Sequence, residues 1–306
     1  MGQWLLERNP DVLLLQETRA PAEIVTGFFP AEDGWQVAVH PSEIKGRSGV
    51  AIVSKLPILE SRAGLAAYQA ADGNSGEVSL RQAQSGATDS TTETGHGNPE
   101  VVSTGSTTDT GATTGEVEPA VDTGRWLEAD LQTPKGGQLT VISAYFHSAT
   151  NTPEMAHTMT AKYAHLDKIG KRLQELAQSQ YPVLVGGDFN IAHENRDIAN
   201  WKGNQNSAGF LPQERAYLTK WFHTDGWTDL GRHHAGEVEG PYTWWSWRGQ
   251  AFTNDKGWRI DYHMGNVLAA HACQHVTVDR HPTYEQRWTD HAPVVGEYEF
   301  PNTPEV

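Results

Sequence analysis

The sequence of 306 residues contains a single cysteine, Cys273. A disulfide needs two, so a disulfide-stapled fold is excluded and a reducing compartment is favoured. No apolar run approaches the roughly 18 residues of a membrane-spanning helix, and no signal-type apolar segment follows Met1. We therefore expect a soluble, cytoplasmic, monomeric protein that does not act at a membrane.

Positive charge is also scarce: 23 Lys and Arg residues stand against 38 Asp and Glu residues, which gives a net charge of −15. Phosphate binding usually leaves a basic footprint, so this balance argues against a protein that coats DNA in general. Residues 63–124 carry nine acidic residues and one basic residue, Arg81, and thus −8 of the total. The remainder is still acidic. It is compatible with an enzyme that has a local cationic face, or with a metal ion that bridges carboxylates to phosphate.

The acidic stretch includes a low-complexity segment, residues 85–117, with no Leu, Ile, aromatic residue, Lys or Arg. Its three valines cannot offset the entropy of ordering it. We expect one domain over residues 1–306, interrupted by a disordered surface insertion at about 63–124.

Short strands alternate with helices on both sides of this segment, which favours an α/β protein with two packed sheets covered by helices. Residues 1–10 are typical of the end of an amphipathic helix that Pro10 closes. Helices are expected at 154–178 and 212–222. Strands are expected at 11–17, 35–40, 48–54, 125–131, 138–146, 182–187, 258–264 and 292–300.

The stretch VLVGGDFN, residues 183–190, is a buried-type strand that ends on Asp188 and Asn190. In an extended chain residues i and i+2 point the same way, so both side-chain oxygens can converge on one point. Gly186 and Gly187 leave room for a bend or a close backbone approach. The alternative is an Asx-type turn that closes the strand.

Other acidic and amide residues share this position at the end of an apolar strand, which predicts strand ends that converge on one oxygen-rich pocket. Hard oxygen ligands of this kind suit Mg²⁺ or Mn²⁺. The residues concerned are Glu17, Asp188, Asn190, Asp261, Asp290 and His291.

Two of the polar aromatic positions, His291 and Tyr145, are ambiguous from sequence. His291 could cap a turn, or an Asp elsewhere could orient its ring for acid–base chemistry. Tyr145 lies at a strand end, where a half-buried sheet tyrosine is the simpler interpretation. We expect His147, His157 and His165 to be surface residues, since they show no ligand-like clustering.

Two stretches have a composition that suits a flat polar partner. YTWWSWR, residues 242–248, places Trp244 near Arg248, and aromatic residues beside Arg can stack on bases and hold phosphate. Core packing is the alternative for these tryptophans. The amide-rich stretch 200–210 includes Lys202 and Asn204, which suit phosphate and backbone contacts, although a solvated loop is equally compatible.

Six motifs in fixed order carry a resemblance: LLLQET, GGDFNIAH, GFLPQER, YTWWSWR, WRIDY and TDHAPV. Together they resemble the exonuclease III family of DNA repair nucleases, within the endonuclease/exonuclease/phosphatase superfamily, over everything except the insertion. The resemblance implies a four-layer α/β sandwich of two packed mixed sheets flanked by helices. It also implies a Mg²⁺- or Mn²⁺-dependent nuclease that acts on abasic or 3′-damaged duplex DNA.

The resemblance implies a role for each matching residue. Glu17 would bind metal, Asp188 would activate the attacking water and touch metal, and Asn190 would stabilise the transition state. Asp290 and His291 match the family's D-H pair, and Asp261 would orient His291. Tyr145 matches an active-site tyrosine, and Trp244 an aromatic residue near the pocket for an abasic sugar.

The beginning of the chain departs from the family pattern. Family members open with a strand that carries a metal-binding asparagine, and this sequence begins after that strand. Two alternatives to a nuclease therefore stay open: a phosphodiesterase or phosphatase of the same fold acting on lipids or small molecules, and a non-catalytic, truncated DNA-binding form.

Overall fold

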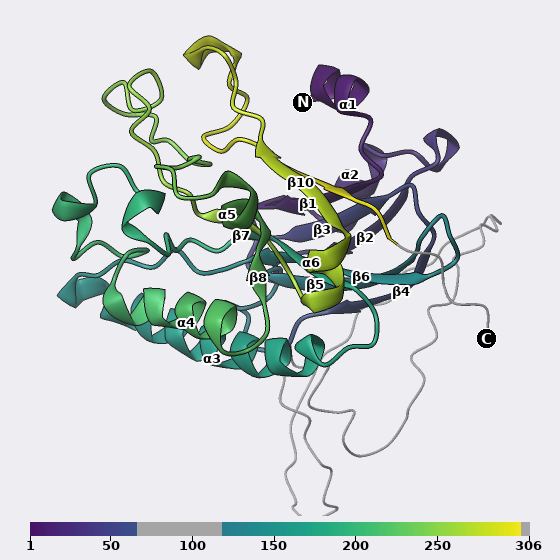
Figure 1. Cartoon of the computed structure of the whole chain (residues 1–306), viewed down its shortest axis with the longest axis horizontal. Helices are drawn as coiled ribbons and strands as arrows, with labels where there is room; N and C mark the ends of the chain where they lie inside the picture. The colour runs from purple at the N-terminus through teal and green to yellow at the C-terminus, as the bar shows by residue number, and fades with distance from the viewer. Residues whose placement is uncertain (66–117, 301–306) are drawn as a thin grey trace, which may run out of the picture.

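The computed structural model describes residues 1–65 and 118–300, which form a mixed α/β fold with sheets flanked by helices (Figure 1). Its strands are β1 (Val12–Gln16), β2 (Gln36–His40), β3 (Val50–Ser54), β4 (Ile58–Ala63), β5 (Trp126–Gln132), β6 (Gln138–Tyr145), β7 (Val183–Asp188), β8 (Thr228–Asp229), β9 (Asp261–Gly265), β10 (Cys273–Val278) and β11 (Val294–Tyr298). Its α-helices are α1 (Gly2–Arg8), α2 (Ala22–Gly27), α3 (Ala156–Ala177), α4 (Pro212–His223), α5 (Leu230–Ala235) and α6 (Val267–Ala272).

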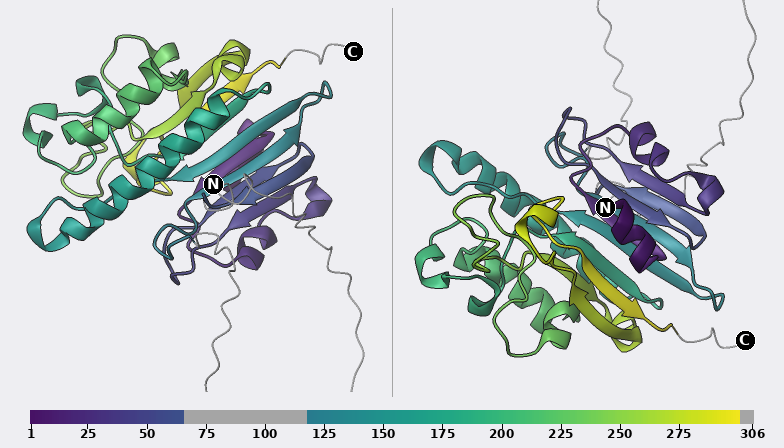
Figure 2. Two further views of the ribbon diagram at one scale, coloured as in Figure 1. Left: turned by 90° about the horizontal axis from the view of Figure 1, so that it is seen from below. Right: turned by 90° about the horizontal axis from the view of Figure 1, so that it is seen from above.

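The largest sheet has six strands in the order β4-β5-β6-β7-β9-β8. Only β6 and β7 run parallel, and α3 makes the crossover that a parallel pair requires. Helices α3 and α4 cover one face of this sheet (Figure 2). Ile142 and Val185 from the sheet pack there against Leu166 and Leu173 of α3 and Trp221 of α4, all fully buried.

A second sheet, β1-β3-β2, packs against the opposite face of the six-stranded sheet. Val50 and Ile52 of β3 meet Leu127 and Leu139 in this inter-sheet core. The sequence prediction of two mixed sheets needs correction here. The second sheet is wholly antiparallel, and β10 and β11 form a separate two-stranded sheet beside it.

The outer face of the second sheet is covered by the N-terminal segment, where the sequence predicted an amphipathic helix. Trp4 of α1 packs with Leu13 and Val53 of the sheet. Trp4 Nε1 also donates to Asp279 Oδ2 at 2.7 Å, and Arg8 binds the same carboxylate at 2.5 and 2.7 Å. Helix α1 is therefore held by polar as well as apolar contacts, which offsets the marginal stability of one so short.

Both ends of the predicted insertion, residues 63–65 and 118–124, belong to the described structure. Strand β4 continues to Ala63, and residues 118–124 pack into the fold, where Asp122 is 5% exposed. The hydroxyl of Thr123 accepts a hydrogen bond from the backbone of Glu43 at 2.9 Å. The prediction of disorder for residues 66–117 lies outside the described residues. Within the described part of the chain, no helix is long and apolar enough to cross a bilayer.

Candidate active site

Three neighbouring inner strands of the six-stranded sheet bring polar residues together at one end of the strands. Tyr145, the last residue of β6, is in register with Asp188, the last residue of β7. Asp188 in turn lies opposite Asp261, the first residue of β9. The sequence predicted that strand ends converge, and the sheet register places these three residues side by side.

The two glycines before Asp188 make this convergence sterically possible. A Cβ on Gly187 would lie 1.9 Å from the carbonyl oxygen of Ala144, and its φ of +147° is one that side chains rarely adopt. A Cβ on Gly186 would meet Leu14 of the second sheet at 2.6 Å. Gly187 therefore requires the close backbone approach that the sequence indicated, whereas Gly186 leaves room for the Leu14 side chain.

Asp188 and Asn190 converge through an Asx turn, and the extended-chain explanation is wrong. The strand ends at Asp188, and Asn190 has a left-handed φ of +51°. The backbone N–H of Asn190 donates to Asp188 Oδ1 at 2.8 Å. Its side-chain amide donates to Asp188 Oδ2 at 2.9 Å and to the carbonyl of Phe146 at 3.0 Å. The amide thus clamps the carboxylate and leaves its own Oδ1 as the acceptor.

His291 is oriented by Asp261. Its Nδ1 lies 2.9 and 3.1 Å from the two carboxylate oxygens of Asp261. Burial lowers the pKa of His291, but the carboxylates of Asp261, Asp188 and Asp290 outweigh it and raise the pKa to about 10. These carboxylates favour the protonated ring, and the contact with Asp261 directs Nε2 away from that residue, so His291 does more than cap a turn.

A buried charge network fixes the start of β9, which begins at Asp261 and not at the predicted residue 258. Arg259 binds Asp197 and Asp229 through four hydrogen bonds of 2.7–3.1 Å. Thr243 Oγ1 accepts from the backbone N–H of Asp261 at 3.1 Å. Together these contacts hold the Asp261 carboxylate in place.

Glu17, which directly follows β1 of the second sheet, joins the site through Tyr145 of β6. The Tyr145 hydroxyl donates to Glu17 Oε1, and burial together with this carboxylate raises the pKa of the phenol. Arg19 binds the other oxygen of Glu17 at 2.7 Å, and the guanidinium of Arg125 stacks over the Tyr145 ring at 4.9 Å. Sequence reasoning missed Arg19 and Arg125, since single arginines outside any motif carry no signal.

The electrostatics of the site fit a hard divalent cation. Burial, followed by repulsion from Asp261 and a smaller contribution from Glu17, raises the pKa of Asp188 to about 7. Carboxylates that destabilise one another in this way offer the oxygen donors that Mg²⁺ prefers, and a cation would relieve the repulsion. Asn190 Oδ1 and Asp290 add further oxygens. Among the described residues, a compact group of Asp, Glu, Cys or His ligand atoms occurs only at Asp122, His147 and His165. The predicted ligands of the candidate site are therefore more widely spaced.

The residues predicted to contact DNA fall into two groups. Trp244 belongs to the site: its Nε1 donates to Asp290 Oδ2 at 3.0 Å, and its backbone bridges to His291. Arg248 and Lys202 are exposed. Asn204 instead closes a local turn, where its amide donates to the carbonyl of Asn200 and its Oδ1 accepts from a serine hydroxyl. The alternative of core packing holds for Trp245, which is 1% exposed.

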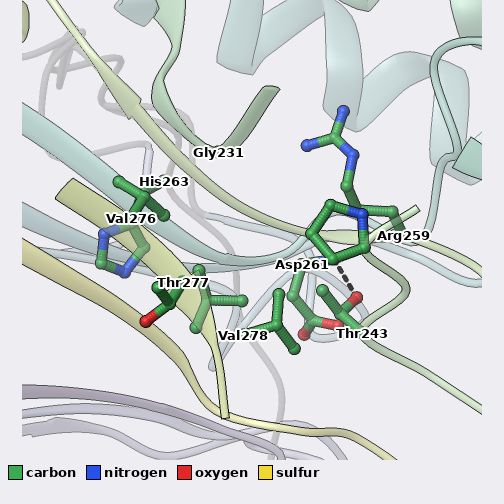
Figure 3. Close-up of a pocket in the computed structure, with 10 residues that line it drawn as sticks. Gly231, Thr243, Arg259, Asp261, His263, Val276, Thr277 and Val278 are labelled. Atoms are coloured by element: carbon green, nitrogen blue, oxygen red, sulfur yellow. Dashed lines mark hydrogen bonds between the residues drawn. The ribbon is translucent and has the colours of Figure 1, made fainter. Parts of the chain in front are cut away.

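A small cavity lies behind Asp261 and does not serve as a substrate pocket. Its volume is about 10 Å³, roughly the space of one water molecule. Figure 3 shows Asp261, Thr243 and Arg259 on one side of it and His263 and Val276 on the other. A larger hollow of about 480 Å³ is lined by residues 194–196, Arg215, Glu237 and Glu239, and includes none of the predicted site residues. Neither hollow corresponds to the strand ends where Tyr145, Asp188 and Asp261 meet.

The comparisons with known proteins agree with this geometry. A model of the Endonuclease/Exonuclease/phosphatase family matches residues 1–291. The exodeoxyribonuclease of Streptococcus pneumoniae (serotype 4) is 38% identical over 170 residues, which are 52% of this chain and 57% of that protein. The chain spans about half the length of the curated relatives it matches.

Solved structures show the same fold. A variant of the 3′ phosphatase NExo from Neisseria, bound to a product DNA hairpin, has a TM-score of 0.67 at 22% identity, covering 98% of this chain and 93% of that one. An AP endonuclease from Archaeoglobus fulgidus has a TM-score of 0.68 at 21% identity, covering 97% and 92%. The family match, which extends over nearly all of the sequence, identifies the chain as a member of the endonuclease/exonuclease/phosphatase family.

Proposed function

We propose that the protein is a divalent-metal-dependent DNA repair nuclease. Its reaction would be the hydrolysis of phosphodiester bonds in duplex DNA, both as a 3′-to-5′ exonuclease and at abasic sites, with removal of 3′ blocking groups. We further propose that its helix, sheet, sheet and helix layers form a four-layer α/β sandwich. The exodeoxyribonuclease and AP endonuclease relatives support this assignment.

One observation carries the proposal: Asp188 is clamped by Asn190 and lies in register with Asp261, which holds His291. Hydrolysis of a phosphodiester needs a base for the attacking water and positive charge for the phosphate oxygens. The site provides both within a few side chains of one another. A purely DNA-binding protein has no use for a buried carboxylate with this environment.

Asp188 is the proposed general base. A base works best when its pKa lies near the working pH, and burial together with Asp261 raises the pKa of Asp188 to about 7 before a cation relieves part of the repulsion. The clamp by Asn190 fixes the carboxylate plane, so that the remaining lone pairs face the water. Asn190 would then act chiefly by positioning Asp188 and by offering Oδ1 to the cation.

His291 is the proposed source of positive charge at the phosphate. With Nδ1 engaged by Asp261, Nε2–H is left to donate to a phosphate oxygen, where negative charge grows as water attacks. Tyr145 holds Glu17 and is in turn covered by Arg125, so this pair would position the carboxylate at the rim.

Glu17, Asp188, Asn190 and Asp290 are the residues that would surround a bound Mg²⁺ or Mn²⁺, which would supply charge stabilisation for the phosphate and leaving oxygens. His291, also expected from the sequence to bind metal, would instead act beside the ion as a donor to phosphate, because its Nδ1 is engaged by Asp261 and a metal-binding imidazole must be neutral. Trp244, held by Asp290, would pack against the extruded abasic sugar. Arg248 and Lys202 would contact the phosphate backbone, and so would Asn204 if its local turn opens.

The substrate class can be tested directly with the full chain. The panel consists of a labelled duplex with one abasic site, an intact duplex with a recessed 3′ end, a duplex with a 3′-phosphate, and a short-chain phosphoinositide, each with Mg²⁺ and with EDTA. We expect incision and 3′ shortening of the duplexes with Mg²⁺ only.

Two outcomes would contradict the proposal. Faster hydrolysis of the phosphoinositide than of DNA would assign the site to a lipid phosphatase. Binding of the duplex that is the same in Mg²⁺ and in EDTA, with no cleavage, would identify a DNA-binding protein without catalysis.

A further inference from the structure

A buried group of three potential ligands lies outside the candidate active site. Asp122 comes from the segment that leads into β5, His147 follows the end of β6 by two residues, and His165 lies in the middle of α3. One ligand atom from each lies within 4.8 Å of the other two. The sequence analysis placed His147 and His165 on the surface, and this prediction is wrong: their side chains are 11% exposed and buried, respectively.

His165 is the unusual member of the group. The residue is 1% exposed, and among the described residues neither ring nitrogen has a hydrogen-bond partner. Nearly all buried polar groups in proteins are paired, so an imidazole with two unpaired nitrogens needs an explanation such as a bound ion. The His147 ring packs edge-on to it, with centroids 5.1 Å apart.

The chemistry of the group matches a transition metal. Two imidazoles and one carboxylate suit Zn²⁺ and similar divalent ions, whereas Mg²⁺ prefers oxygen ligands alone. Burial lowers the pKa of His165 to about 3, so the ring is neutral at physiological pH, as a ligand must be. Asp122 keeps a lowered pKa despite burial, through the hydrogen bond from His147 and nearby cations, and supplies the negative charge.

The three ligand atoms, which lie within 4.8 Å of one another, would have to draw closer together around an ion. With Zn–N distances near 2.0 Å, neighbouring ligand atoms in a tetrahedral site lie roughly 3.3 Å apart. His147 Nε2 and Asp122 Oδ1 are already 2.8 Å apart. Lys168 Nζ, at 3.6 Å from Asp122 Oδ2, is the competing cation that a metal ion would displace.

We propose that Asp122, His147 and His165 form a binding site for a divalent transition metal, best matched by Zn²⁺, separate from the oxygen-rich site at Asp188. A metal there joins the segment before β5 to the end of β6 and to α3. Arg125, three residues after Asp122, donates to the carbonyl of Val121 at 2.9 Å and stacks on Tyr145. The bound ion thereby stabilises the surroundings of the candidate active site.

Zn²⁺ itself is the probe for this site. The full chain is stripped with a chelator and kept in excess Mg²⁺, and Zn²⁺ affinity is measured by competition with a chromogenic chelator, in parallel with the melting temperature. A competing pair of potential Zn²⁺ ligands must be removed first, because Cys273 Sγ lies 3.4 Å from His234 Nε2. The background is therefore Cys273→Ser combined with His234→Gln.

Two variants remove ligands, and one serves as a control. His165→Leu replaces the buried ring by an apolar side chain, and Asp122→Asn keeps the shape of the carboxylate. His157→Gln changes an exposed histidine of the same helix. We expect one Zn²⁺ per chain that Mg²⁺ does not displace, and a higher melting temperature with Zn²⁺.

We also expect both ligand variants to lose at least about 100-fold in Zn²⁺ affinity, since even outer-sphere partners of a metal are worth 10- to 100-fold. The control should bind as the background does. Co²⁺ in place of Zn²⁺ should give visible absorption that disappears in the folded Asp122→Asn variant. Unchanged Zn²⁺ affinity in folded His165→Leu or Asp122→Asn protein, or displacement of Zn²⁺ by Mg²⁺, would overturn the proposal.

Discussion

The contact between Asp261 and His291 allows a quantitative prediction. Replacing Asp261 by Asn keeps the size of the side chain and the backbone hydrogen bond to Thr243, but removes the charge that holds His291. A hydrogen bond to a charged group contributes about 1.5–3 kcal/mol. If that contribution is lost only in the transition state, the rate of the chemical step falls about 10- to 150-fold.

The assay is single-turnover cleavage of an abasic duplex by saturating enzyme, with duplex affinity measured separately. Asp261→Asn should slow cleavage by that factor and leave affinity unchanged, because the contact does not touch DNA directly. Asp33→Asn, at an exposed position in the turn before β2, is the matched control and should cleave as the parent does.

A double-mutant cycle tests the physical reason. In a His291→Gln background the additional Asp261→Asn change should cost little further, because its effect passes through His291. Parental cleavage by Asp261→Asn, or an additive loss in the double variant, would refute the pairing argument.

Three further predictions concern stability. Gly187→Ala should lower the free energy of unfolding by about 3 kcal/mol or more, since its Cβ meets the Ala144 carbonyl. The control Gly136→Ala, in an open turn at positive φ, should lower it by about 1 kcal/mol. Equal losses in urea unfolding would contradict this. Lys162 lies 2.6 Å from Glu214, and both side chains are fully buried. Lys162→Met leaves Glu214 as an unpaired charge and should lower the free energy of unfolding by about 3–5 kcal/mol, which is a melting-temperature drop of roughly 6–20 °C. The double variant Lys162→Met/Glu214→Gln should recover part of this drop, and an unchanged melting temperature in Lys162→Met would refute the prediction. Burial lowers the pKa of His263 to about 4, so its contribution to stability is complete above pH 6.5 and is lost as pH falls towards 4. The melting temperature of His263→Gln should therefore fall less steeply than that of the parent over this interval. Melting temperatures of the two proteins that fall in parallel would count against this assignment.

Much of the fold follows from local patterns in the sequence. The apolar runs at β3, β5, β6 and β7 are largely buried strands, that at β1 is a half-buried strand, and the long periodic helix is α3. Strands β4 and β10 were missed because they are half exposed, with Glu60, Arg62 and His275 breaking the apolar pattern. Their place in the sheets depends on partners far away in the chain, which periodicity does not encode.

The candidate site was predictable where a motif marks it. Asp188, Asn190, Asp261 and His291 lie together as the strand-end argument anticipated. The convergence of Asp188 and Asn190 comes, however, from the Asx turn that had been the simpler alternative, so turn chemistry and site chemistry coincide here. Their catalytic and metal-binding roles stay predictions.

The buried Asp/His group was not predictable from sequence. Asp122 lies 25 residues before His147 and next to the low-complexity segment. The polar composition of that segment predicts that its residues are exposed to solvent. His165 lies on the buried face of α3 beside Leu166 and Ile169, and a single histidine there carries no signal of its own. Only the crossover from β6 through α3 brings the three side chains together.

The most direct test of the central claim is single-turnover cleavage of a labelled abasic duplex with Mg²⁺, comparing the parent chain, Asp188→Asn and the control Asp33→Asn, with duplex binding and circular dichroism measured on each. The account predicts incision by the parent and by the control, and at least about a 100-fold loss in folded, DNA-binding Asp188→Asn, since a general base contributes about 10²–10⁴-fold. Incision by Asp188→Asn at the parental rate would contradict it.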